Sequence, residues 1–189
     1  MSNQFEKAAL LVMDYQNGIV ERFADNKEVL LPAQKAVATA RAHNIPVIFV
    51  RVGFSEGYPE VSPRNRGFSR IASLGGMTTS DDSTQIHESV KPEGNEPVVT
   101  KYRISAFAGS TLELILRSRD IDTLIISGIS TSGVVLSTLR EAADRDFALT
   151  VLSDACLDND AEVHQVLMEK VFPRQADVLT VNAWVESLN

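Results

Sequence analysis

Short apolar runs alternate along this chain with segments whose apolar positions repeat every three or four residues. The first run, Ala8 to Met13, is continuous, as expected for a strand covered on both faces. The segment from Val29 to His43 places its apolar side chains on one stripe of a helix. Such alternation predicts parallel strands joined by helical crossovers. Five further strands are expected at residues 46–52, 97–100, 123–127, 148–153 and 176–181.

Local signals place helices between these strands. Residues Ser110 to Glu113 match a capping box that begins a helix. A further helix, from about Asp160 to Phe172, is expected to stop at Pro173. Together the elements predict an α/β fold, a three-layer α/β/α sandwich with a six-stranded, mostly parallel sheet. By its length the chain is expected to form a single domain over residues 1–189.

The segment from Gly53 to Pro97 is long, irregular and rich in glycine, proline and serine. Structureless segments of this length are uncommon and often serve as lids or oligomer contacts. Arg64 and Arg66 within it could clamp an acidic substrate or contact another subunit, because arginine suits bidentate recognition of carboxylates. The simpler alternative is that both are solvated surface side chains.

Composition narrows the classes of partner. The net charge of −7 argues against nucleic acid and anionic membranes as main partners, although a local pocket can differ from the whole. The single cysteine, Cys156, excludes an intrachain disulfide and a cysteine-cluster metal site. The polar N-terminus, residues 1–7, lacks a signal-peptide pattern, and no apolar run approaches the roughly 20 residues of a membrane span. We therefore expect a cytoplasmic protein.

Polar residues follow several of the expected strands. Because the carboxyl ends of parallel strands share one edge of the sheet, these residues should converge on a ligand-binding edge. Taken singly, an aspartate there is often only a turn carboxylate, and a lysine only a solvated surface group. The residues are Asp14, Lys101, Ser130, Thr131, Asp154 and Cys156.

Four sequence elements occur here in a specific order and spacing. They are Asp14-Tyr15-Gln16, Lys101 followed by Ser105-Ala106-Phe107, the turn from Gly128 to Thr131 with the helix from Thr138 to Ala143, and the stretch from Ser153 to Cys156. In this order they resemble the isochorismatase-like hydrolase superfamily, which includes isochorismatases, nicotinamidases and related amidases. The resemblance covers nearly the whole chain.

The resemblance also exposes a departure at the nucleophile. In the amidase branch a cysteine lies three positions after the threonine, with an aspartate as its base and a lysine that balances charge. Asp14, Lys101 and Thr131 match that arrangement, but Val134 occupies the cysteine position. A hydrocarbon side chain cannot attack a carbonyl. The resemblance therefore implies a member of the superfamily without the usual nucleophile and without a thioester route.

A second precedent in the superfamily needs no thiol. Isochorismatases proper have glycine at this position and cleave a vinyl ether, whose difficult step is protonation of carbon. General acid catalysis is typically worth about 10²–10⁴ in rate, and Asp14 is the candidate acid, with Lys101 to orient it or stabilise charge. A nearby ammonium lowers a carboxyl pKa whereas burial raises it, and the sequence leaves that balance open. Val134 is bulkier than glycine and would narrow the pocket.

The resemblance further implies a cis peptide bond between Ile129 and Ser130, with backbone N–H groups of Ser130 and Val134 facing the substrate oxygen. Phe54 and Tyr58 either line the pocket or pack in the core. The full set expected to bind substrate or an oxyanion is Gln16, Ser130, Thr131, Val134 and Phe107.

No metal or organic cofactor is expected. Nicotinamidase relatives carry an Asp-x-His motif after the second strand, where this chain reads Arg51-Val52-Gly53-Phe54. The three histidines, His43, His87 and His164, are scattered, with His43 at a helix end and His164 on a helix surface.

We therefore expect a hydrolase that acts through Asp14 and Lys101 on a small metabolite, for which an anion is one option. The alternatives are a catalytically inactive protein that binds a small molecule, and an amidase that uses activated water. Cys156 or Ser132 could replace the nucleophile, but a lone cysteine is usually a buried small hydrophobe and a serine at a helix start is usually a cap. Superfamily members are usually dimers or larger, so a homodimer or homotetramer is expected, with the segment 53–97 partly at the interface.

Overall fold

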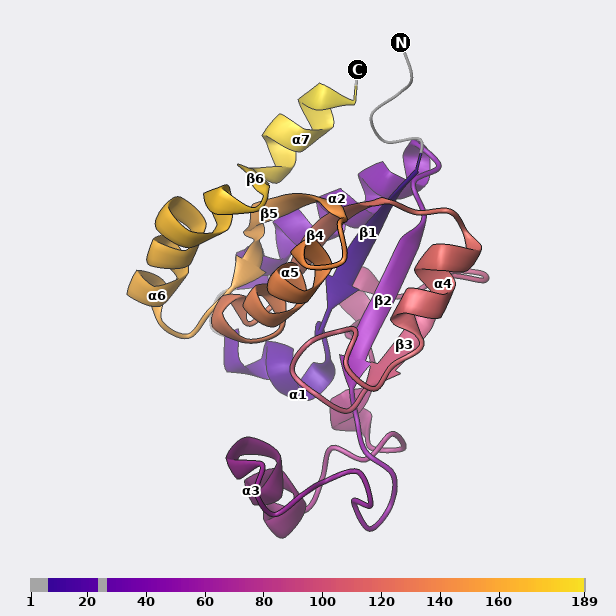
Figure 1. Ribbon diagram of the computed structural model, residues 1–189, viewed down its shortest axis with the longest axis vertical. Coiled ribbons are helices and arrows are strands. Elements are labelled where there is room, and N and C mark those ends of the chain that lie inside the picture. Colours follow the sequence, from indigo (N-terminus) through magenta and orange to yellow (C-terminus); the bar gives the residue numbers. More distant parts are fainter. Residues whose placement is uncertain (1–6, 24–26, 189) are drawn as a thin grey trace.

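The fold is built on one six-stranded sheet, in which all pairings are parallel. The computed structural model describes residues 7–23 and 27–188, so that residues 1–6 of the polar N-terminus lie outside the description. The strand order is β3-β2-β1-β4-β5-β6 (Figure 1). The strands are β1 (Ala8–Met13), β2 (Val47–Val52), β3 (Val98–Lys101), β4 (Thr123–Ile129), β5 (Ala148–Leu157) and β6 (Asp177–Leu179).

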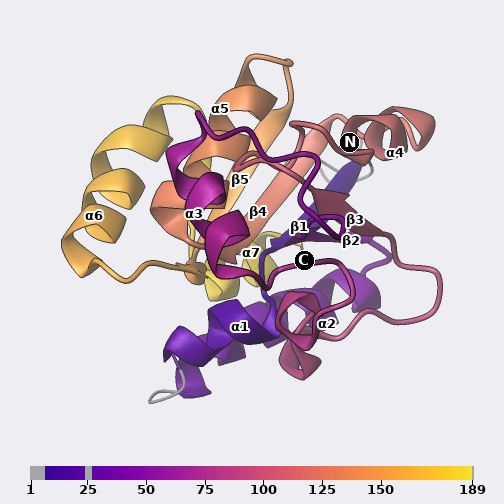
Figure 2. The same cartoon turned by 90° about the horizontal axis from the view of Figure 1, so that it is seen from below.

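Helices lie on both faces of the sheet, which confirms the expected three-layer sandwich (Figure 2). Strand β1 shows why its apolar run is continuous. Ala9, Leu11 and Met13 pack into the core beneath α4 (Leu112–Ser118) and α5 (Leu136–Ala143), whereas Leu10 and Val12 pack into the core beneath α2 (Leu31–Ala42) and α7 (Val181–Ser187). The α-helices are α1 (Asn17–Val20), α2 (Leu31–Ala42), α3 (Arg66–Leu74), α4 (Leu112–Ser118), α5 (Leu136–Ala143), α6 (Ala161–Val166) and α7 (Val181–Ser187). None of the described helices is long and apolar enough to cross a membrane.

The strand order places a topological switch point beside β1. The chain passes from β1 outward to β2 and β3, then returns to add β4, β5 and β6 on the other side. In such a sheet a crevice forms outside the carboxyl ends of the strands where the order reverses, here β1 and β4. The ends of these two strands, Met13 and Ile129, therefore lead directly into the candidate site.

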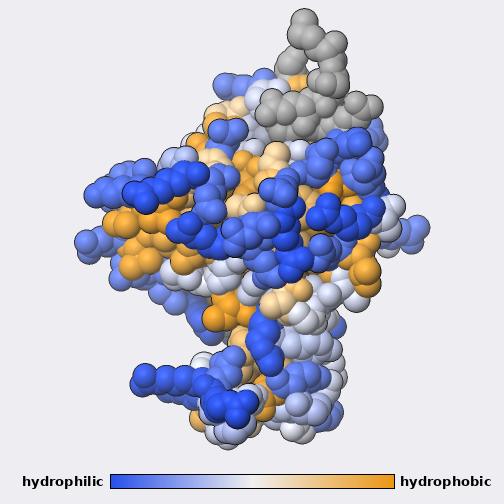
Figure 3. All heavy atoms as spheres, viewed as in Figure 1, coloured by the Kyte–Doolittle hydropathy of each residue, from blue (hydrophilic) through white to orange (hydrophobic). Residues whose placement is uncertain are grey.

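The segment from Gly53 to Pro97, expected to be irregular, contains a regular helix that was not predicted from the sequence. This helix is α3 (Arg66–Leu74). The side chain of the residue before it, Asn65, caps the helix by accepting a hydrogen bond from the backbone N–H of Phe68, and Gly75, with a φ of 76°, follows its last residue. A cap and a glycine that flank a helix are signals the sequence carried. Helix α3 stands apart from the body of the protein, with a notch between the two in the space-filling view (Figures 1 and 3).

Two expected helix boundaries also differ. The prediction of a capping box at Ser110 is wrong. The Ser110 hydroxyl accepts a hydrogen bond from the backbone N–H of Leu112, and the Glu113 carboxylate forms an ion pair with Arg145 instead of bonding to the backbone N–H of Ser110. The helix expected to run to Phe172 is regular only over α6 and continues as a wider π-helical turn, Leu167–Val171. Pro173 then lies in a 3₁₀ turn, Phe172–Arg174.

Gly128 in β4 should tolerate no side chain. A Cβ there would lie 3.1 Å from the carbonyl oxygen of Met13 and 3.1 Å from Cγ2 of Val135. We expect Gly128→Ala to lower the free energy of unfolding by about 1–3 kcal/mol through overpacking, measured by urea denaturation. Gly67→Ala is the matched control, because its Cβ would approach only Asn65 Oδ1 at 3.9 Å. Equal stabilities of the two variants would contradict close packing of β1 on β4.

Candidate active site

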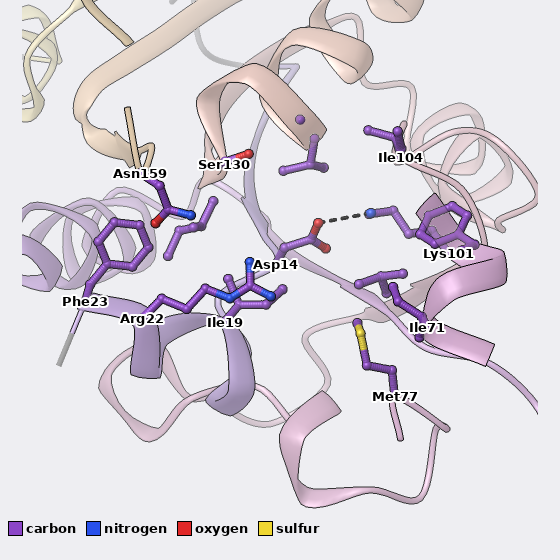
Figure 4. A pocket seen from close by; sticks show the side chains of 15 residues that line it. Asp14, Ile19, Arg22, Phe23, Ile71, Met77, Lys101, Ile104, Ser130 and Asn159 are labelled. Carbon is purple, nitrogen blue, oxygen red and sulfur yellow. Dashed lines mark ion pairs between the residues drawn. The ribbon is translucent and has the colours of Figure 1, made fainter. Parts of the chain in front are cut away.

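A pocket of about 250 Å³ opens at the carboxyl ends of β1 and β4 (Figure 4). Its walls come from segments far apart in the sequence, which is the arrangement the switch point predicts. At about 250 Å³ it is smaller than the roughly 300–1,000 Å³ of typical sites for drug-sized ligands, so it suits a small molecule. The lining residues are Asp14, Ile19, Arg22, Phe23, Val52, Phe68, Ile71, Met77, Lys101, Ile104, Ile129, Ser130, Gly133, Val134 and Asn159.

Asp14 and Lys101 meet in this pocket as a buried ion pair. Lys101 Nζ lies 3.0 Å from Asp14 Oδ2, and the two side chains are 2% and 7% exposed. The ammonium also donates to the carbonyl oxygen of Arg103 at 3.0 Å. The other carboxylate oxygen, Asp14 Oδ1, is buried without a hydrogen-bond partner among the described residues. A buried polar oxygen of this kind is poised to bond to a ligand or a water molecule.

The backbone explains how Asp14 leaves the strand. Its N–H still donates to the carbonyl of Val50 at 2.8 Å, but its φ of 59° lies in the left-handed region. Aspartate and asparagine tolerate this conformation better than most residues because their short side chains bond locally. The chain therefore turns out of the sheet at Asp14, and its carboxylate is directed into the pocket (Figure 4).

Burial decides the direction in which the pKa of the Asp14 carboxyl shifts. Loss of solvation raises the pKa of the Asp14 carboxyl, whereas the charge of Lys101 and its hydrogen bond lower it. The net direction is upward from the ordinary aspartate value. Asp14 therefore holds a proton at a higher pH than an exposed aspartate, as a general acid must.

The turn after β4 forms the opposite wall. The Ile129–Ser130 peptide bond is cis, and Ser130, Gly133 and Val134 line the pocket. Val134 is 2% exposed and presents only hydrocarbon to the cavity. The backbone N–H of Ser132 donates to Asp158 Oδ2 at 2.7 Å, which ties this turn to the segment after β5. The Ser132 side chain is exposed and lies outside the pocket lining.

Three of the expected binding residues do not line the pocket. The Gln16 amide is buried and bonds to the backbone of Val52, through both its Oε1 and its Nε2. Phe107 packs against Phe147, with ring centroids 5.9 Å apart. Thr131 is fully buried behind the turn. These contacts give all three a role in packing the walls, which spacing along the sequence does not reveal.

Thr131 has a partner that sequence reasoning missed. Its Oγ1 lies 2.8 Å from Nδ1 of His164 in α6. His164 is half-buried, not a surface residue as its sequence context indicated. Burial lowers the pKa of His164, and the charge of Asp158 opposes that shift. This favours the neutral imidazole, which holds the turn against α6 through one hydrogen bond.

Other candidates lie away from the pocket. Phe54 packs against Tyr58 and Phe68, and of these only Phe68 reaches the lining. Arg64 and Arg66 are exposed and do not line it. The arginine that does is Arg22, in the 3₁₀ turn Glu21–Phe23, which sequence reasoning missed.

Cys156 is 2% exposed and its thiol faces the carbonyl oxygen of Ile126. Burial raises the pKa of the Cys156 thiol to about 12, and a backbone hydrogen bond from Gly128 opposes that shift only in part. Among the residues described, no group of three or more histidine, cysteine, aspartate or glutamate side chains is arranged to hold a metal ion.

The folded protein should resist thiol alkylation. With a buried thiol of such high pKa, we expect iodoacetamide at pH 8 to leave Cys156 unmodified under native conditions and to modify it fully in denaturant, as read by mass spectrometry. Cys156→Ser, which has no thiol, controls for labelling at other residues. Rapid native labelling with a parallel loss of turnover would instead support Cys156 as the nucleophile.

Fold and site together define a parallel α/β protein with a buried carboxylate and ammonium at its switch point. The isochorismatase domain family matches residues 8–183, and the chain belongs to that family. Two relatives are an uncharacterised isochorismatase family protein, YecD, of Escherichia coli O157:H7 (34% identical, covering 95% of each chain) and the ureidoacrylate amidohydrolase RutB of Pseudomonas savastanoi pv. phaseolicola (28% identical, covering 97% of this chain and 81% of the relative). A cysteine hydrolase from Pseudomonas syringae pv. phaseolicola 1448A shares the fold, with a TM-score of 0.88 at 22% identity over 96% of this chain and 92% of that one.

Proposed function

We propose that this member of the isochorismatase family is a hydrolase that acts on a small metabolite by acid/base chemistry of Asp14, without a cysteine nucleophile. One observation carries the proposal. In the pocket, Asp14 Oδ1 is buried and has no hydrogen-bond partner within the described part of the chain, while Oδ2 is held 3.0 Å from the Lys101 ammonium. A carboxyl group with one oxygen anchored and the other without a hydrogen-bond partner can exchange a proton with a ligand.

The acid route fits this geometry best, because the pKa of Asp14 is raised by burial. On a vinyl ether, the Asp14 O–H bond breaks and a C–H bond forms at the enol carbon, which leaves an oxocarbenium ion. Lys101, 3.0 Å away, stabilises the carboxylate formed. Water then adds to the cation and returns its proton to Asp14, and the hemiketal collapses to a carbonyl compound and an alcohol.

The absence of a thiol from the pocket lining supports a route independent of cysteine. Val134 stands where the amidase branch carries its nucleophile, and Cys156 is buried outside the pocket. An amide or ureide would instead need water activated by ionised Asp14. The name of the relative RutB, a ureidoacrylate amidohydrolase, makes ureides the second class to test.

The test is a turnover screen of small vinyl ethers, ureides and amides, with product detected by mass spectrometry. The proposal expects turnover in one class by the wild type and its collapse in Asp14→Asn. Equal product from both proteins would refute the mechanism. Each compound is also tested for thermal stabilisation, since ligands that raise the melting temperature without yielding product would support the competing proposal. That competitor is a binding protein without catalysis, which Val134 in the pocket wall favours.

We further propose that residues 1–189 form one domain, supported by the single sheet that runs through the described residues.

We also propose that the protein assembles as a homodimer or homotetramer. Light scattering after size-exclusion chromatography tests it, and a monomeric mass would remove it.

A further inference from the structure

We propose that Arg22 selects a small carboxylate as the ligand of this pocket, by binding its anionic group while the reactive bond lies against Asp14. This inference deepens the proposed function and rests on it. Arg22 lines the pocket from the 3₁₀ turn Glu21–Phe23, and its side chain extends toward Asp14 (Figure 4).

Arg22 is available to a ligand. Among the described residues, no hydrogen bond or ion pair engages its guanidinium, whereas the guanidinium of Arg41 is paired with Glu93 and Glu96. The only ion pair among the pocket-lining side chains of Figure 4 joins Asp14 to Lys101. A free guanidinium beside an apolar cavity presents a planar fork of donors that matches a carboxylate.

The charge of the pocket has the opposite sign to the charge of the protein. The chain carries a net −7, but among the described residues the charged side chains that line the pocket are Asp14, Arg22 and Lys101. With Asp14 ionised the pocket keeps one positive charge in excess, and with Asp14 protonated it keeps two. An anion is therefore attracted to this pocket although the surface as a whole repels it.

The remaining walls of the pocket limit the size and polarity of the rest of the ligand. Around Asp14, Arg22 and Asn159 lie on one side of the view, and Ile71, Met77 and Ile104 lie on the other (Figure 4). A ligand whose carboxylate bonds to Arg22 and Asn159 thus places the neighbouring atoms at Asp14 and an apolar end against the far wall. The volume of about 250 Å³ suits a small carboxylate.

Benzoate and benzamide provide the test, since they share shape and differ in charge. We expect calorimetry to show that wild-type protein binds benzoate about 10- to 100-fold more tightly than benzamide, the range of a hydrogen-bonded charge pair. The ratio should fall to near one in Arg22→Gln and be partly kept in Arg22→Lys. It should be unchanged in Arg64→Gln, which makes the same charge change at an exposed arginine outside the pocket.

Three results would overturn the inference: no measurable binding of benzoate, a ratio near one in wild type, or an undiminished ratio in Arg22→Gln. The readout is binding alone, so it is separable from the proposed function. A carboxylate preference that depends on Arg22, found without any turnover, would uphold the selection of a carboxylate by Arg22 and support the competing proposal of a binding protein without catalysis. Turnover that is lost in Asp14→Asn but unchanged in Arg22→Gln would support the proposed hydrolase and refute the role of Arg22.

Discussion

Replacing Asp14 by asparagine should lower turnover by about 10²–10⁴-fold while the protein stays folded, because it removes the only carboxyl group that lines the pocket among the described residues. Asparagine suits this test better than alanine for two reasons. It tolerates the φ of 59° at this position, and its amide oxygen can still accept a hydrogen bond from Lys101. The loss should therefore appear in kcat, with circular dichroism reporting an intact fold at the assay temperature, while the Lys101 ammonium left without its counter-charge lowers the melting temperature.

Asp154→Asn is the matched control for this change. Asp154 belongs to strand β5, which is separated from β1 by β4, and its Oδ1 accepts a hydrogen bond from the N–H of Val181 at 2.7 Å, outside the pocket. An amide can accept the same bond, so turnover should stay close to that of wild type. A comparable loss in both variants would show that the effect is structural and would remove Asp14 from the reaction.

Removing the partner of Asp14 should have the largest effect on stability. Lys101→Met deletes an ammonium that is 2% exposed and leaves the Asp14 carboxylate buried without a counter-charge. Breaking a buried pair in this way typically costs about 3–5 kcal/mol, because the desolvated charge is no longer compensated. Urea denaturation at neutral pH measures the loss, and a change below about 1 kcal/mol would contradict the buried pair.

The loss in Lys101→Met should depend on pH in a defined direction. Burial already raises the folded-state pKa of Asp14 above its ordinary value of 3.8. Lys101→Met removes the charge and the hydrogen bond that oppose this rise, so the pKa rises further. Since the folded state then binds the proton more tightly than the unfolded state, stability is greatest below the unfolded pKa and falls as pH rises toward the folded pKa.

The free energy of unfolding of Lys101→Met should therefore approach that of wild type near pH 4 and diverge from it at higher pH. The double variant Asp14→Asn/Lys101→Met separates this from lost packing, because it has no titrating group in the pair and should show no such divergence. It should also recover part of the stability. A loss independent of pH would mean that Lys101 acts only by filling space.

The positions of the strands followed from local pattern alone. The run Ala8–Met13 needs no tertiary information, since six consecutive apolar residues are stable only with cover on both faces. Strand β5 continues to Leu157, beyond the expected residue 153, because its end pairs with Gly128 and Ile129 of β4. Such pairing cannot be read from polar residues at a strand end. Helix α3 was missed for a different reason: its flanking signals at Asn65 and Gly75 lie in a segment whose composition resembles a loop.

The sequence by itself determined the class of fold and the family resemblance, and it pointed to Asp14 and Lys101 as the residues proposed to carry the chemistry, because strand periodicity and the order of motifs can be read along the chain. Only the tertiary structure decided which side chains share the pocket. Gln16, Thr131 and Phe107 turn to backbone, histidine or aromatic partners, whereas Arg22 enters from a short turn that no motif marks. The direction of the Asp14 pKa likewise depends on burial against attraction by Lys101, and both follow from distances in space that spacing along a chain does not fix.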